Sequence, residues 1–122
     1  MEVIWSKYFK SDVNFYRKKK KYTKINEDIL PVVADLRAGN LVGDKMQNLH
    51  LEEGTAAYKV RAANSSANVG KSNGFRIIYY VIIGEKAYLL TIYSKKDDER
   101  ILNDARIMMM IKNILEGGEN DG

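Results

Sequence analysis

The feature that most constrains the fold is a pair of apolar runs separated by only three residues. The runs cover residues 75–83 and 87–94, and Gly84, Glu85 and Lys86 lie between them. A short, glycine-containing connection between two β-prone runs is typical of a tight hairpin. The first run is apolar at successive positions, which is typical of a central strand covered on both faces. The chain is therefore expected to form a sheet around this hairpin.

A third strand is expected just before the hairpin, in residues 57–63 (AYKVRAA). Successive side chains of a strand point to opposite faces, so this segment has one apolar face and one basic face that carries Lys59 and Arg61. The intervening residues 64–74 (NSSANVGKSNG) are polar and small and include glycine, so they should form a loop that carries Lys71.

An edge strand and a first helix are expected at the N-terminus. Residues 2–9 are apolar-rich and form the expected edge strand. Ser11 or Asp12 can then cap a helix that runs into the basic segment 17–24. Cations near the C-terminal end of a helix are favoured by its dipole.

A second helix is expected from near Ile29 to a stop signal at Gly39. Asn26 or Asp28 can cap this helix, and Pro31 is tolerable only within its first turn. The apolar residues at helical spacing are Ile29, Val32, Val33 and Leu36.

The remaining segments are a loop, a last helix and a tail. Residues 40–54 are expected to form a loop that contains His50, the only histidine. A last helix is expected over residues 104–115, with a buried side formed by Ile107, Ile111 and Ile114. Residues 116–122 (EGGENDG) are expected to be a disordered tail.

Composition bounds the class of protein. With 122 residues, the chain is expected to be one domain spanning residues 1–122. It has no cysteine, which suits a reducing, cytoplasmic compartment and excludes a disulfide framework and a thiolate metal site. The N-terminus carries charged residues throughout, unlike a signal peptide. No apolar run approaches the roughly 18 residues of a membrane-spanning helix.

Positive charge is concentrated in the strand region. The whole chain has a net charge of +4, whereas residues 58–96 contain seven lysines and arginines and one acid, a net charge of +6. A small sheet with cations and phenols along its strands suits an anionic partner, and RNA is the obvious candidate.

The cations of these strands have a specific chemistry. Arg grips a phosphate through two parallel hydrogen bonds, and Lys acts as a point charge. Gathered on one face, Lys59, Arg61, Arg76 and Lys95 would hold an RNA backbone and stabilise a phosphorane-like transition state. The alternative is a solvated face whose cations pair with carboxylates from elsewhere in the chain.

Tyr93 ends the second strand of the hairpin, two residues before Lys95. A phenol has a reference pKa of about 10, and surrounding cations favour the phenolate. Such a tyrosine can take the proton from a ribose 2′-hydroxyl or stack on a base. The alternative is a strand tyrosine that only packs its ring.

His50 has a reference pKa near neutrality, but a histidine-pair ribonuclease mechanism needs two histidines. We therefore expect His50 to be an ordinary surface residue. One histidine and scattered carboxylates make a weak metal-ligand set, so no metal is expected. Residues 70–74 lack the spacing of a nucleotide-binding P-loop.

The sharpest charge run is residues 17–24 (RKKKKYTK), in which six of eight residues are basic. It can dock on ribosomal RNA or a phosphate backbone, where each contact adds salt-sensitive affinity. It can equally be a solvated helix end. The RNA-binding candidates are therefore Lys59, Arg17, Lys18, Lys19, Lys20 and Lys21.

At these residues the chain resembles the RelE/ParE superfamily of bacterial toxin–antitoxin toxins, most closely its HigB-like and RelE-like members. The likeness lies in YKVR, a loop with GKSNG, FRIIYYV and YLLTIYSKKDDERI, and it covers roughly residues 57–101. It implies a RelE-like α+β fold, with two N-terminal helices packed on a small, twisted, mostly antiparallel sheet, plus a C-terminal helix.

The resemblance also implies a function. Such a toxin enters the ribosome, cuts translated mRNA by attack of a ribose 2′-hydroxyl and arrests growth, and a cognate antitoxin protein holds it inactive. The implied activity uses no metal, no small-molecule cofactor and no membrane. The catalytic residues that the resemblance implies are Arg61, Lys71, Arg76, Tyr93 and Lys95.

Two other functions fit the same residues. One is a gyrase poison without nuclease activity, as in the ParE branch of the superfamily. The other is an RNA- or protein-binding module without catalysis, which would bind RNA in a salt-dependent way and leave the message intact. The basic, tyrosine-bearing strands favour the ribonuclease, because the gyrase branch does not keep this set of residues.

Overall fold

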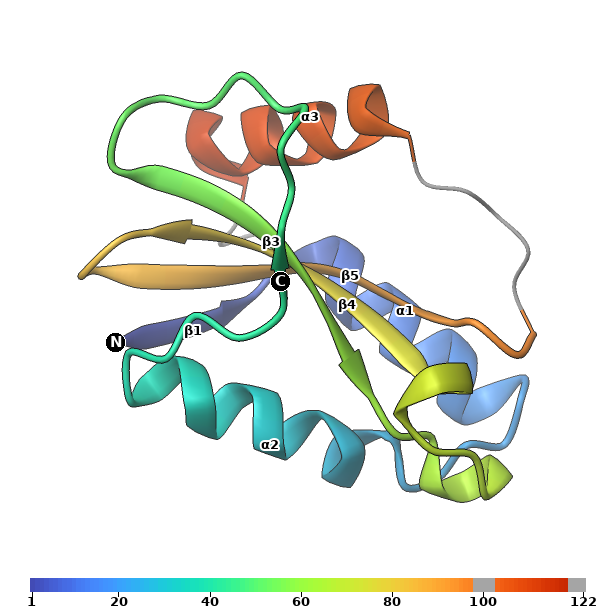
Figure 1. The fold of residues 1–122 in the computed structure, drawn as a ribbon. Helices are drawn as coiled ribbons and strands as arrows, with labels where there is room; N and C mark the ends of the chain where they lie inside the picture. The colour runs from blue at the N-terminus through green and yellow to red at the C-terminus, as the bar shows by residue number, and fades with distance from the viewer. Residues whose placement is uncertain (98–102, 119–122) are drawn as a thin grey trace.

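The protein has an α+β fold in which a five-stranded sheet separates two helical layers (Figure 1). A computed structural model describes residues 1–97 and 103–118. Helices α1 and α2 cover one face of the sheet, and α3 covers the other. The helices are α1 (Lys7–Lys18), α2 (Ile25–Arg37) and α3 (Asp104–Asn113). The strands are β1 (Glu2–Trp5), β2 (Asp44–Lys45), β3 (Thr55–Ala62), β4 (Phe75–Ile82) and β5 (Lys86–Ser94).

The sheet is mixed, with the strand order β1-β5-β4-β3-β2. β1 is parallel to β5, and the other neighbouring pairs are antiparallel. The expected hairpin is confirmed as β4 and β5, and the expected third strand is confirmed as β3. The arrangement confirms the α+β class and the mostly antiparallel sheet that the sequence predicted.

Two apolar layers meet at β4, the central strand. Its residues Phe75, Ile77 and Tyr79 are fully buried toward α1 and α2, while Ile78 and Tyr80 are buried toward α3. Helices pack on both faces of the sheet at β4, so its alternate side chains face a covered surface on either side. On the α3 side, the predicted residues Ile107, Ile111 and Ile114 are all buried.

Helix α1 takes the place of a strand along part of β5. β1 pairs only with residues 86–89 of β5, which leaves the backbone of residues 90–94 without a strand partner on that side. Side chains of α1 and its cap bond this backbone instead. Ser6 Oγ donates to the Leu90 carbonyl (3.0 Å), the Ile92 amide donates to Asp12 Oδ2 (3.1 Å), and the Ser94 amide donates to the Tyr16 hydroxyl (2.9 Å).

The start of α1 differs from the prediction. The edge strand ends at Trp5 rather than at residue 9, and Ser6 caps the helix by accepting a bond from the Phe9 amide (3.1 Å). The prediction that Ser11 or Asp12 caps the helix is wrong, because both residues lie inside it. The Asp12 carboxylate has a different role, because it accepts hydrogen bonds from β5.

The start of α2 also differs from the prediction. The helix begins at Ile25, without a side-chain cap, so Pro31 lies in its interior rather than in its first turn. Asp28 does not cap the helix, because its carboxylate accepts a bond from the Ser65 amide (3.0 Å). Pro31 is exposed, so water can reach the carbonyl that loses its helical partner. The predicted buried residues Ile29, Val32, Val33 and Leu36 are confirmed.

The predicted loops contain short elements. Residues 40–54 include the two-residue strand β2, and residues 64–74 include the 3₁₀ turns η1 (Ser65–Ala67) and η2 (Lys71–Asn73). Helix α3 is followed by η3 (Ile114–Gly118), in which Glu116 and Gly117, the first residues of the predicted tail, have non-helical backbone angles. Residues 119–122 lie outside the described residues. Within residues 1–97 and 103–118, no helix is long and apolar enough to cross a bilayer.

Candidate nucleic-acid interface

Two arginines and a tyrosine lie side by side across three strands. In the sheet register, Arg61 of β3 is opposite Arg76 of β4, and Arg76 is opposite Tyr93 of β5. Directly opposed residues of antiparallel strands share one face, with Cβ atoms about 4.5–5.5 Å apart. We call these three residues the arginine–tyrosine row. Further along β4 on the same face, Ile78 and Tyr80 pack in the cluster that includes α3.

A β-bulge sets the register of this row. Ile78 is opposite Thr91 and Tyr79 is opposite Leu89, so β5 has one extra residue at this point. A bulge of this kind shifts all later side chains by one position relative to the partner strand. The shift places Tyr93, rather than Ile92 or Ser94, opposite Arg76.

Arg76 is buried and anchored to the turn η2. Its side chain is only 5% exposed. Its Nη1 donates to the Lys71 carbonyl and its Nη2 donates to the Ser72 carbonyl, both at 2.9 Å. Burial lowers the pKa of Arg76, and the charge of Arg61 lowers it further, while Tyr93 acts in the opposite direction. Arg76 still carries its charge at neutral pH, so it places a fixed positive charge in the middle of the row.

Arg61 differs from Arg76 because its side chain is exposed. Together with Lys59 and Lys71 it lines a groove of about 450 Å³ at the edge of β3. Among the described residues, no ion pair joins Arg61 or Arg76 to a carboxylate. The guanidinium of Arg61 is therefore available to an anionic ligand.

The far wall of this groove is acidic, which the sequence did not indicate. The carboxylates that line it are Glu27, Asp28 and Asp35 of α2 and Asp44 of β2. The packing of α2 against β3 brings the first three of these residues near the basic strands, and the pairing of β2 with β3 places Asp44 opposite Lys59. The groove therefore has walls of opposite charge.

The other predicted site lysines lie around the row. Lys59 is on the same face as Arg61 and is opposite Ile78. The Lys95 amide donates to the Gly74 carbonyl (2.9 Å), which extends the pairing of β4 and β5 beyond Ser94. The side chains of Lys59, Lys71 and Lys95 are all exposed.

The basic run lies near the end of β5. Arg17 and Lys18 form the last turn of α1, and all of residues 17–21 are exposed. The charge of Lys20 lowers the pKa of Asp97, three residues after Ser94. The run thus approaches the turn that follows Tyr93, although it is more than 70 residues away in sequence.

His50 lies apart from the row and is exposed, as expected. It lines a second pocket of about 580 Å³ whose walls include apolar residues of α3, among them Met108 and Met109. In the described part of the chain, no group of three or more histidine or acidic side chains is placed to hold a metal ion.

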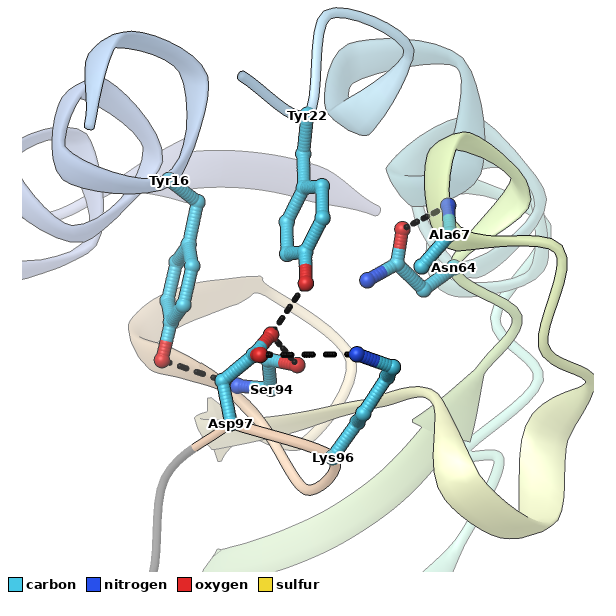
Figure 2. A network of polar contacts seen from close by, with 7 residues as sticks. All are labelled: Tyr16, Tyr22, Asn64, Ala67, Ser94, Lys96 and Asp97. Atoms are coloured by element: carbon cyan, nitrogen blue, oxygen red, sulfur yellow. Dashed lines mark hydrogen bonds and ion pairs between the residues drawn. The ribbon is translucent and has the colours of Figure 1, made fainter. Parts of the chain in front are cut away.

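The sequence analysis missed a polar cluster at the end of β5 (Figure 2). Asp97 accepts hydrogen bonds from the hydroxyls of Tyr22 and Ser94, and Lys96 Nζ lies 3.8 Å from its carboxylate. The side chain of Asn64 is fully buried beside them, and its Nδ2 has no hydrogen-bond partner among residues 1–97 and 103–118. The sequence shows only that an acid follows Lys95 and Lys96, and nothing in it connects that acid to Tyr22.

Within the described residues, the groups suited to bind a nucleic acid are the arginine–tyrosine row and the cations around it. The end of the YLLTIYSKKDDERI motif, residues 98–101, lies outside those residues. No protein-family model matches the chain, and no similar curated protein was found by sequence comparison. The RelE/ParE resemblance therefore remains a hypothesis about this protein.

Proposed function

We propose that the protein is the toxin of a type II toxin–antitoxin system, with the RelE-like fold and activity that its motifs imply. It would cut translated mRNA on the ribosome and so inhibit translation. The observation that carries this proposal is the arginine–tyrosine row, in which two guanidinium groups and a phenol occupy adjacent positions on one face of the sheet.

The chemistry follows from the roles that these groups can take. The 2′-hydroxyl oxygen upstream of the scissile bond attacks the adjacent phosphorus, and the bond from phosphorus to the 5′-oxygen breaks. The products are a 2′,3′-cyclic phosphate and a 5′-hydroxyl. Arg61 is exposed and would bind the non-bridging oxygens, and the buried charge of Arg76 would stabilise the negative charge that develops on them.

The proton balance needs a base and an acid. Tyr93 in its phenolate form, or the neutral form of Lys71 or Lys95, would take the proton from the 2′-hydroxyl. A second cationic lysine would give a proton to the departing 5′-oxygen. Acid–base participation of this kind contributes roughly 10²–10⁴-fold to a rate. The arrangement supports Tyr93 first, because it is directly opposite Arg76.

The remaining cations suit a longer RNA contact and a protein inhibitor. Lys59 and the basic run Arg17–Lys21 are exposed and would bind backbone phosphates on either side of the cleaved bond or on ribosomal RNA. An antitoxin that covers this surface is expected to present an acidic or amphipathic segment, since complementary charge speeds association.

The test compares matched arginine variants. Expression of the wild-type chain should arrest growth and produce new mRNA 5′ ends in a translating extract. Arg61→Ala should reduce cleavage about 10²-fold, the usual effect of losing one oxyanion-stabilising donor. Arg37→Ala is the control, because Arg37 is an exposed arginine at the end of α2, on the other side of the sheet.

Three outcomes would count against the proposal. Intact mRNA with inhibited supercoiling would indicate a gyrase poison. Salt-dependent RNA binding with intact mRNA would indicate a non-catalytic binding module. Full toxicity of Arg61→Ala together with Tyr93→Phe would show that the row is not the active site.

A further inference from the structure

We propose that Asp97 is a positioning residue, which uses the hydroxyls of Tyr22 and Ser94 to fix the end of β5 that carries Tyr93 and Lys95. This inference rests on the proposed function of the arginine–tyrosine row. Asp97 belongs to none of the motif positions to which a catalytic role was assigned.

One carboxylate oxygen of Asp97 accepts hydrogen bonds from two hydroxyl groups. Asp97 Oδ2 accepts from Tyr22 Oη and from Ser94 Oγ (2.9 Å for the second bond), as Figure 2 shows. The Asp97 amide donates to the Ser94 carbonyl (3.2 Å), which closes a tight turn. One side chain thus joins the turn after β5 to the connection between α1 and α2.

Tyr22 is itself held firmly, so the carboxylate has a fixed partner. The Tyr22 ring is buried, stacks on Tyr16 with 12° between the ring planes, and meets the edge of Phe75 at a centroid distance of 6.1 Å. The Tyr16 hydroxyl accepts the Ser94 amide, and Phe75 precedes Arg76. The aromatic cluster therefore contacts β4 and β5, two of the three strands that carry the row.

Ser94 is the residue through which the Asp97 carboxylate can affect the arginine–tyrosine row. Its side chain is fully buried, and it lies between Tyr93 and Lys95 in sequence. A buried hydroxyl without an acceptor is destabilising, so removal of Asp97 would force Ser94 to turn or admit water. Either change loosens the pairing of Tyr93 with Arg76 and of Lys95 with Gly74.

The charge state of Asp97 suits this role. Burial acts to raise its pKa, but the hydrogen bonds from Tyr22 and Ser94 and the charges of Lys96 and Lys20 together lower it below the ordinary value. The carboxylate is therefore ionised at neutral pH and is a strong acceptor. Asn64 is buried beside the same cluster, and its Oδ1 accepts a bond from the Ala67 amide in the connection between β3 and β4 that carries Lys71.

The decisive experiment compares Asp97→Ala with Asp97→Asn in single-turnover cleavage of mRNA on programmed ribosomes. Because both hydroxyls donate to a single oxygen, an asparagine carbonyl can keep both bonds and lose only the charge. Asp97→Ala should lower the cleavage rate at saturating ribosome at least 10-fold, with the half-saturating concentration unchanged within 3-fold. Asp97→Asn should stay within 3-fold of wild type.

Tyr22→Phe supplies a second test with a matched control. It should slow cleavage, and combining it with Asp97→Ala should slow it no further, because the two residues act through one bond. The control is Tyr8→Phe, which also removes a hydroxyl with a side-chain partner, the Asn113 amide (2.6 Å), but on the α3 side of the sheet. It should cleave at the wild-type rate.

Amide hydrogen exchange separates failure of this inference from failure of the proposed function. In Asp97→Ala, exchange of the Ser94 and Lys95 amides should accelerate at least 10-fold while the amides of α3 keep their protection. That result supports the positioning role even if the wild type does not cut RNA. Unchanged exchange at Ser94 and Lys95, or equal loss of cleavage in Asp97→Asn and Asp97→Ala, would overturn it.

Discussion

Replacement of Arg76 by lysine should destabilise the protein, whereas the same replacement at Arg61 should not. Both arginines lie on one face and are directly opposed. Arg76 makes two hydrogen bonds of 2.9 Å to carbonyls of η2, and Arg61 is exposed. A lysine ammonium at position 76 keeps the charge but lacks the rigid fork whose two nitrogens reach the Lys71 and Ser72 carbonyls separately, so we expect it to replace only one of the two bonds.

The size of the effect follows from that lost bond. A hydrogen bond from a charged group contributes about 1.5–3 kcal/mol, so Arg76→Lys should cost about 2 kcal/mol of unfolding free energy. With a urea m-value of roughly 2 kcal/mol/M, the unfolding midpoint should fall by about 1 M. Arg61→Lys should change the unfolding free energy by less than about 0.5 kcal/mol.

The assay is urea unfolding of the purified variants, followed by far-ultraviolet circular dichroism. Equal midpoints for Arg76→Lys and the wild type would show that the contacts to η2 do not stabilise the fold. Equal losses in both variants would show that the bonds to η2 do not distinguish Arg76 from the exposed Arg61.

Four further predictions concern pH, packing and salt. The lowered pKa of Asp97 favours its ionised form in the folded protein, so its stabilising contribution should be lost as the pH falls below about 4, and Asp97→Asn should flatten this part of the stability profile. The pKa of Tyr22 is raised, chiefly by burial and by its bond to Asp97, so stability should fall as the pH rises above about 10, and Tyr22→Phe should remove that loss in thermal melts. Gly74→Ala should cost about 1–3 kcal/mol or more, because a Cβ there would lie 2.2 Å from a backbone oxygen, whereas Gly70→Ala, which meets nothing within 4 Å, should melt like the wild type. Replacing three lysines within residues 18–21 by glutamine should reduce the slope of log affinity for single-stranded RNA against log salt by about 2, and an unchanged slope would remove the basic run from the interface.

The sheet could be predicted from the sequence because its signals are local. The runs 75–83 and 87–94 have the length and composition of strands, and Gly84 marks the turn between them. The helix starts could not be predicted as well, since Ser11 and Asp12 resemble caps in sequence. Only the tertiary bond from Asp12 to β5 explains why that acid lies inside a helix.

The row could be predicted in part. Strand alternation indicated a basic face on β3, but the alignment of Tyr93 with Arg76 depends on a bulge that has no sequence signal. The burial of Arg76 against η2 likewise depends on the path of a glycine-containing loop. The link from Tyr22 to Asp97 spans 75 residues and arises only from packing.

The hydrogen bonds between α1 and β5 limit the insertions that this helix can accept. Ser6, Asp12 and Tyr16 reach the β5 backbone from one side of the helix. One residue inserted before Asp12 would rotate the rest of α1 by about 100°, given about 3.6 residues per turn. Asp12 and Tyr16 would then both leave β5, and two buried amides would lose their acceptors at about 1–3 kcal/mol each. The length of α1 between Ser6 and Tyr16 is therefore a stricter requirement of the fold than the identity of its exposed residues.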